Sequence, residues 1–166
     1  MADLDLFPPP PDPARPARVA SLHRSAGGVP KLAIPEATVT AAGIEGDRQR
    51  NLKYHGGPDR ALCLYSQELI DALRAEGHPV EPGWMGENIV IAGLDWRRMV
   101  PGTRVRLGVV EIELTAYALP CRNIRGSFTG GRVGRVSPET HPGWSRLYAR
   151  VLHGGTLAPN DPVEIR

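Results

Sequence analysis

The sequence predicts a mainly β protein with a few helices, built as a closed or nearly closed barrel. Short apolar runs with strand-like patterning recur along the chain. Its 19 glycines and 17 prolines are scattered between these runs as turn signals and do not gather in one linker. One segment has the pattern of a substantial helix. Many short strands with regular turns and a single helix are typical of small barrels, and an open sheet is the alternative.

The strand predictions follow the apolar runs in chain order. RALCLY (60–65) suits a buried strand, and NIVIAG (88–93) is similar and ends at a glycine. VRLG (105–108) is followed by VVEIELTAY (109–117), whose apolar residues alternate with two glutamates as in a half-buried strand. LYARVLHGG (147–155) and DPVEIR (161–166) complete the set.

The predicted helix begins after Ser66, which has a side chain suited to an N-cap. Leu69, Ile70 and Leu73 make an apolar stripe at helical spacing. Gly77 ends the helix, and the proline two residues later prevents its continuation.

The chain of 166 residues is expected to form one domain over residues 16–166, preceded by a Pro-rich flexible tail over residues 1–15. The stretch FPPPPDP in that tail favours an extended polyproline conformation. No run approaches the length of a membrane span, and the first residues lack the apolar and basic regions of a signal peptide. These features predict a cytoplasmic protein that is not inserted in a membrane.

Charge and residue choice narrow the class of ligand. The formal net charge is +2, and Lys31 and Lys53 are the only lysines, so nearly all basic residues are arginines. Arginine suits a phosphate or carboxylate partner, although a biased codon composition gives the same skew. No basic run is interleaved with aromatic residues, which argues against nucleic-acid binding.

Three polar stretches interrupt the strand pattern, and the first is GIEGDRQRNLKYHGGPDRAL (43–62). Its glycines permit close backbone approach, and its arginines and histidine suit an anion cradle. It matches neither the nucleotide P-loop nor the dinucleotide-binding fingerprint. The alternative is a surface loop in which Asp47 pairs with Arg48 or Arg60.

The second stretch is GWMGENIVIAGLD (83–95), in which Glu87 and Asn88 precede a predicted strand. These two residues are either turn and edge residues or a polar pair directed into a pocket at the barrel rim.

The third stretch, LTAYALPCRNI (114–124), places Cys121 directly after Pro120. Because proline ends strand pairing, Cys121 is expected at a strand terminus near the rim. Arg122 follows at once, and positive neighbours favour the nucleophilic and metal-binding thiolate. Cys63 lies in an apolar run and is expected to behave as a small buried hydrophobe.

Two other uses of these residues are disfavoured. A structural zinc site needs four Cys or His ligands, usually in close pairs, but Cys63 has no CxxC partner and the histidines are widely spaced. A His–Cys hydrolase dyad using His55 has no local support for an oxyanion hole or a third orienting group.

Taken in order, five motifs resemble the MOSC domain, the C-terminal module of molybdenum-cofactor sulfurases, in its small stand-alone bacterial form. The motifs are GIEGDR (43–48), YHGGPDRAL (54–62), GENIVIAGLD (86–95), LPC (119–121) and YARVL (148–152). The resemblance covers the chain apart from its tail.

This resemblance implies a β-barrel of the MOSC type whose cleft binds the molybdenum cofactor (molybdopterin). It implies that Cys121 is the functional cysteine, either as a molybdenum ligand or as a sulfur carrier, and a soft thiolate suits both tasks. The cofactor would contact Arg122 and the residues that match the family motifs, namely Gly46, Asp47, Arg48, His55, Gly56, Gly57, Arg60, Glu87 and Asn88.

The resemblance leaves two activities open, reduction of N-hydroxylated small-molecule substrates and sulfur transfer. The first requires a redox partner and the second a cysteine desulfurase, since the sequence shows no flavin fingerprint, iron–sulfur cysteine set or pyridoxal-phosphate domain. Pyridoxal phosphate binding is associated with the family as a whole. A non-catalytic barrel that binds a small anion or pterin is the alternative. Residues 124–147 form either a lid over Cys121 or a mobile loop.

Overall fold

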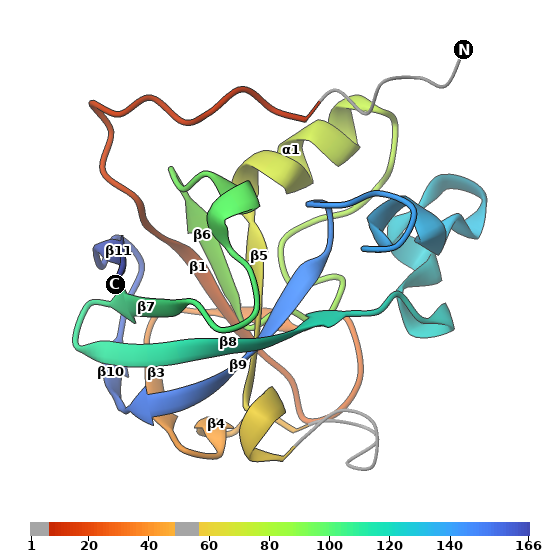
Figure 1. The fold of residues 1–166 in the computed structure, drawn as a ribbon. Helices are drawn as coiled ribbons and strands as arrows, with labels where there is room; N and C mark the ends of the chain where they lie inside the picture. The colour runs from red at the N-terminus through yellow and green to blue at the C-terminus, as the bar shows by residue number, and fades with distance from the viewer. Residues whose placement is uncertain (1–6, 49–56) are drawn as a thin grey trace.

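The computed structural model describes residues 7–48 and 57–166 and confirms a mainly β protein with few helices (Figure 1). A mixed eight-stranded sheet has the order β11-β7-β8-β9-β5-β6-β1-β2, and a second sheet has the order β10-β3-β4. Only β5 and β6 pair in parallel among these described strands. The strands are β1 (Arg18–Arg24), β2 (Leu32–Ile34), β3 (Ala37–Thr40), β4 (Gly43–Ile44), β5 (Leu62–Ser66), β6 (Ile89–Ala92), β7 (Arg104–Leu107), β8 (Val110–Ala118), β9 (Arg146–His153), β10 (Gly155–Leu157) and β11 (Val163–Ile165).

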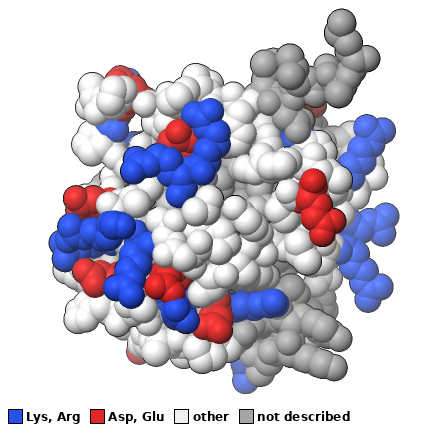
Figure 2. All heavy atoms as spheres, viewed as in Figure 1, with Lys and Arg blue, Asp and Glu red and all other residues white. Residues whose placement is uncertain are grey.

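The strands predicted from apolar patterning are present. β8 alternates as expected, with Val110, Ile112 and Leu114 buried and the intervening glutamates partly exposed. On the face seen in Figure 2, basic and acidic side chains are interspersed. One such ion pair joins Arg104 of β7 to Glu113 of β8. The sequence analysis did not identify β1 to β4 or β10.

The predicted helix is α1 (Gln67–Ala75), and its boundaries have the expected causes (Figure 1). The Ser66 hydroxyl accepts the Leu69 N–H at 3.2 Å, and Gly77 takes a φ of +97° after the last turn. Leu69, Ile70 and Leu73 are buried in the core. No helix within residues 7–48 and 57–166 is long and apolar enough to cross a membrane.

The closed barrel is not confirmed as a continuous ladder, because β2 and β11 are the edge strands of the larger sheet in the described part of the chain. The segment that leads into β11 nevertheless pairs with the start of β1. Arg18 and Pro162 form an isolated antiparallel bridge, and the Val163 N–H donates to the Ala17 carbonyl at 3.0 Å. The sheet is therefore curved enough to bring its β11 side against β1.

Two segments expected to be mobile contact the domain. Phe7, in the predicted tail, packs edge-on against Trp144 with ring centroids 5.5 Å apart. Residues 122–136 fold into three short 3₁₀ helices, Arg122–Ser127, Thr129–Gly131 and Val133–Val136. The Arg135 guanidinium lies 3.8 Å from the centroid of the Trp144 ring. Much of residues 124–147 is therefore packed structure, which does not fit the mobile-loop alternative.

Candidate functional site

A cavity of about 200 Å³ lies against one face of the sheet where β5, β8 and β9 run side by side. In register across these strands, Cys63 of β5 is opposite Tyr148 of β9, and Tyr148 is opposite Ala116 of β8. Four segments outside these strands supply the remaining walls. The lining residues are Gly28, Val29, Lys31, Arg48, Cys63, Met85, Gly86, Cys121, Asn123, Ile124, Arg146 and Tyr148.

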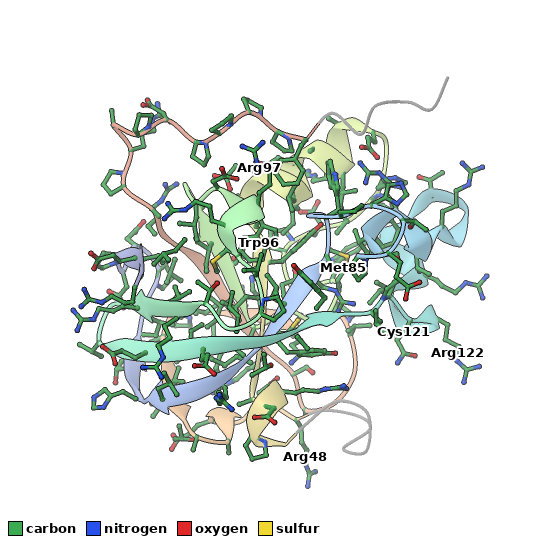
Figure 3. The ribbon with its side chains drawn as sticks, viewed as in Figure 1. Arg48, Met85, Trp96, Arg97, Cys121 and Arg122 are labelled. Carbon is green, nitrogen blue, oxygen red and sulfur yellow. The ribbon has the colours of Figure 1, made fainter. Side chains whose placement is uncertain are left out.

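Cys121 lies where the sequence places it, three residues beyond the end of β8 and half-buried at the wall of the cavity (Figure 3). Its carbonyl accepts the Ile124 N–H at 3.2 Å, which starts the first 3₁₀ helix. The Arg122 side chain is exposed and points away from Cys121 in Figure 3. Arg122 does not line the cavity.

Cys63 also lines the cavity, which the sequence analysis missed. The thiol is buried as predicted, with only 6% of the residue exposed. Burial raises the pKa of Cys63, and the nearby positive charge of Arg146 offsets this only in part, so the thiol is neutral at physiological pH. The apolar run around Cys63 conceals this position, because β5 is buried on both faces.

Arg146 is another lining residue that the sequence analysis missed. It begins β9, is only 5% exposed, and donates from Nη1 to the Met85 carbonyl at 2.6 Å and from Nη2 to the Leu119 carbonyl at 3.2 Å. Within residues 7–48 and 57–166, its Nε has no hydrogen-bond partner. Its charge acts on Cys63 and Cys121. The signal for this residue in the sequence was its position as a basic residue directly before the predicted strand 147–155.

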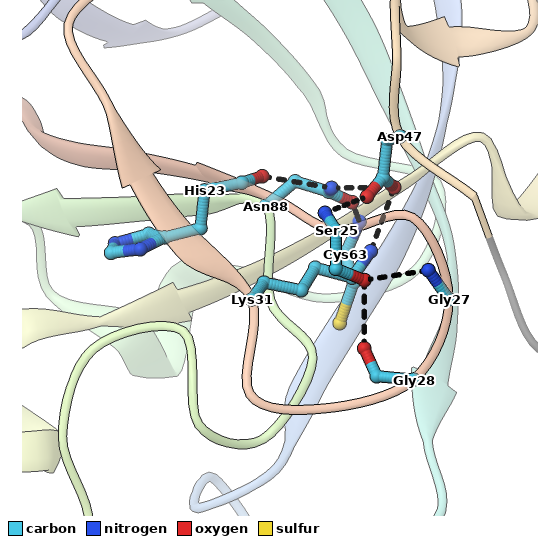
Figure 4. A network of polar contacts seen from close by, with 8 residues as sticks. All are labelled: His23, Ser25, Gly27, Gly28, Lys31, Asp47, Cys63 and Asn88. Carbon is cyan, nitrogen blue, oxygen red and sulfur yellow. Dashed lines mark hydrogen bonds and ion pairs between the residues drawn. The ribbon is translucent and has the colours of Figure 1, made fainter.

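Asp47 is the centre of a buried polar network beside the cavity (Figure 4). Its Oδ2 accepts from Lys31 Nζ at 2.7 Å and from Asn88 Nδ2 at 2.9 Å, and its Oδ1 accepts the Ser25 N–H at 2.9 Å. The side chains of Lys31 and Asp47 are 6% and 5% exposed. The surface pairing of Asp47 with Arg48 or Arg60 is therefore wrong, because the carboxylate turns inward to the one lysine among the described residues.

Asn88 connects this network to the backbone of Cys63. Its Oδ1 accepts the Cys63 N–H at 3.1 Å, and its own N–H donates to the Cys63 carbonyl at 2.8 Å. Its Nδ2 also donates to the His23 carbonyl at 3.2 Å. Asn88 thus does not line the cavity but fixes the strand position that presents the Cys63 thiol to it.

Glu87 has a similar supporting position. It is fully buried, and its carboxylate accepts the Gly83 N–H at 2.5 Å and the Met85 N–H at 3.2 Å. Burial raises the pKa of Glu87, while these amide hydrogen bonds lower it. Glu87 therefore shapes the turn that carries Met85 and Gly86 into the wall and does not itself line the cavity.

The remaining predicted residues are spread around the site. Arg48 is exposed and contributes to the lining, whereas Gly46 lies beside the Arg24 guanidinium with a φ of +82°. Gly57 and Arg60 are exposed, and the Arg60 guanidinium lies 5.1 Å from the centroid of the Tyr148 ring. The other two, His55 and Gly56, lie outside the described residues.

The described residues contain no group of three or more His, Cys, Asp and Glu side chains arranged to hold a metal ion.

Comparison with known proteins identifies relatives of this chain. The model of the MOSC domain family matches residues 51–164. The chain is 32% identical to Protein YiiM of Escherichia coli over 137 residues, covering 78% of this chain and 59% of that protein. It is 30% identical to Uncharacterized protein YflK of Bacillus subtilis over 123 residues, covering 74% and 55%. It thus spans little more than half the length of these relatives.

Solved structures show the same fold. The crystal structure of YiiM from Escherichia coli aligns with a TM-score of 0.64 at 25% identity, covering 91% of this chain and 68% of that one. YiiM from Geobacillus stearothermophilus aligns with a TM-score of 0.67 at 21% identity, covering 91% and 75%.

Proposed function

Because this chain belongs to the MOSC domain family, we propose that it binds the molybdenum cofactor at the cavity beside Cys121. The observation that supports this most is the combination of a half-buried thiol with a wall that carries Lys31, Arg48 and Arg146. Among the described residues that line the cavity, none is acidic.

The residues present fit such a group. A thiolate is a soft ligand suited to a transition metal, and guanidinium groups suit the anionic oxygens of the cofactor. The cavity of about 200 Å³ is smaller than the roughly 300 Å³ at which sites for drug-sized ligands begin, so it would hold only one end of the cofactor. The remainder would be bound outside this cavity, by other residues or by a partner subunit.

The two activities use Cys121 differently. As a reductase, the chain would hold molybdenum through the Cys121 thiolate, and the bound cofactor would supply electron transfer to an N-hydroxylated substrate. As a sulfur carrier, the Cys121 thiol would attack the outer sulfur of a persulfide on a cysteine desulfurase, release the thiol of that enzyme's cysteine, and hold the sulfur as a persulfide of its own. In both cases Arg146 offsets negative charge at the thiol, and Asn88 and Asp47 hold the wall in place.

The test is to measure molybdenum by elemental mass spectrometry and pterin by fluorescence after oxidation, on protein purified from a host that makes the cofactor. Cys121→Ser is compared with Cys63→Ser as the matched thiol control. We expect molybdenum and pterin in near-stoichiometric amounts, with molybdenum lost in Cys121→Ser and retained in Cys63→Ser.

Other results separate the alternatives. A wild-type protein without molybdenum but with a persulfide on Cys121 would support the sulfur carrier. Pterin bound equally by wild type and Cys121→Ser, with no metal and no persulfide, would favour the non-catalytic binder and contradict the proposed role of Cys121.

A further inference from the structure

Arg146 carries a buried positive charge that forms no ion pair with a carboxylate of the described residues. The residue is only 5% exposed, and it forms no ion pair with any residue in the described ranges. Burying an ionised group without a counter-charge is strongly unfavourable, so buried charges in proteins are normally paired. The burial of Arg146 therefore requires an explanation.

The other buried cation at this cavity has its partner. Lys31 donates to Asp47 at 2.7 Å, so the charge of Lys31 is compensated within the fold. Glu87 is the nearest candidate for Arg146 and interacts with it electrostatically. Its carboxylate, however, is engaged with the N–H groups of Gly83 and Met85 and forms no ion pair with Arg146.

The hydrogen bonds of Arg146 fix its orientation without using all its donors. A guanidinium has five N–H donors, and the carbonyls of Met85 and Leu119 take one from each Nη. Nε is buried and has no hydrogen-bond partner among the described residues. The side chain is thus held rigidly in the cavity wall with donors in reserve, which is the arrangement of a preorganised anion-binding group.

We propose that Arg146 forms an anion subsite in the wall of the cavity, where it binds a negatively charged oxyanion group of the ligand beside Cys121 and Cys63. Arg146 lines the same cavity as both thiols, and its charge acts on both. Tyr148 and Ile124 also line the cavity, and none of its described lining residues is acidic.

This inference deepens the proposed function by giving the chemical class of the group handled at Cys121. Whatever Cys121 binds or transfers would carry negative charge at that point.

The experiment uses cofactor-free full-length protein, so that its outcome does not depend on molybdenum binding. The rate at which iodoacetamide alkylates Cys121 is followed by peptide mass spectrometry in chloride and, at equal ionic strength, in inorganic phosphate, sulfate or molybdate. The variants are Arg146→Met, which removes the charge at similar length, and Arg146→Lys, which keeps the charge but not the planar fork. Arg98→Met, at an exposed position outside the cavity, is the matched control.

We expect at least one oxyanion to slow the alkylation of Cys121 in the wild type and in Arg98→Met. The apparent affinity for that anion should fall at least about tenfold in Arg146→Met, the lower end of what a charged hydrogen bond contributes. Arg146→Lys should retain part of it. Absence of protection in the wild type by all three anions, or equal protection in Arg146→Met, would overturn the proposal.

A second measurement keeps the test decisive if Arg146→Met does not fold. Iodoacetate is anionic and iodoacetamide is neutral, so the ratio of their rates at Cys121 reports the charge beside the thiol. In the wild type, phosphate, sulfate or molybdate that occupies the subsite should lower this ratio relative to chloride. A ratio that none of the three anions changes would contradict the subsite.

Discussion

Replacing Asp47 by asparagine should be the most damaging isosteric change near the site. Asp47 accepts three hydrogen bonds, and one of them comes from the charged Lys31 ammonium at 2.7 Å. The side chains of the two residues are 5% and 6% exposed, so water does not replace the lost partner. Asp47→Asn therefore leaves a buried ammonium without a counter-charge.

The magnitude follows from that burial. Removing one member of a buried ion pair costs about 3–5 kcal/mol, because the other charge stays desolvated. A domain of this size loses roughly 2–4 °C in Tm for each kcal/mol, so Asp47→Asn should lower the Tm by roughly 6–20 °C. Lys31→Met should cost less, because Asp47 keeps the donors from Ser25 and Asn88.

Urea denaturation of wild type, both single variants and the double variant gives the coupling energy of the pair. We expect the double variant to be more stable than additivity predicts by about 2 kcal/mol or more. The control is Glu111→Gln, which removes an exposed ion pair with Arg106 and should change stability by less than about 1 kcal/mol. Additivity of the Asp47 and Lys31 effects within about 0.5 kcal/mol would refute the argument from burial.

Three further predictions concern other features of the fold. The hydrogen bond from Arg135 lowers the pKa of Glu76, so Glu76→Gln should destabilise the protein at pH 7. The difference in unfolding free energy between wild type and variant should shrink as the pH falls below the ordinary glutamate pKa of about 4.3 and through the lowered pKa of Glu76. Equal differences at pH 7 and in acid would contradict this. A Cβ on Gly83, at a φ of +86°, would collide with a main-chain carbonyl, so Gly83→Ala should lower the free energy of unfolding in urea by at least about 2 kcal/mol. The loss should be clearly smaller for Gly77→Ala, where φ is +97° but no atom is near. Equal losses would show that the clash is unimportant. Iodoacetamide should label Cys63 only after unfolding, because burial protects the thiol and raises its pKa; rapid labelling of the native protein would disprove this.

The sequence was sufficient for elements whose stability is local or strictly periodic. The helix α1 has its cap, apolar stripe and terminating glycine within a dozen residues, and β8 shows its alternation over nine residues. The strands β2 and β4 contain only three and two residues, too few for any period to be visible. Their pairing is decided by contacts with distant strands, which a single sequence does not display.

Cys121 was predictable for the same reason, since a proline and the end of an alternating strand fix its position locally. Arg146 was not, because its burial depends on the carbonyls of Met85 and Leu119, 61 and 27 residues away in the chain. Cys63 was half predictable. Its burial followed from an apolar run, but its exposure to the cavity follows from its register with Tyr148, which only the sheet defines.

The two acidic residues singled out in the glycine-rich stretches, Asp47 and Glu87, lie behind the cavity wall and not in it. Asp47 and Glu87 are acidic, and a carboxylate in the wall would repel the anionic ligand that Arg146 is placed to bind. Behind the wall, each instead holds a lining element through hydrogen bonds, Asp47 through Lys31 and Glu87 through the backbone of Met85. The Met85 carbonyl in turn accepts a hydrogen bond from Arg146. The buried carboxylate of Glu87 therefore positions the guanidinium without forming an ion pair with it. Substitution of Glu87 should therefore alter anion protection of Cys121 through Arg146, although Glu87 itself does not line the cavity.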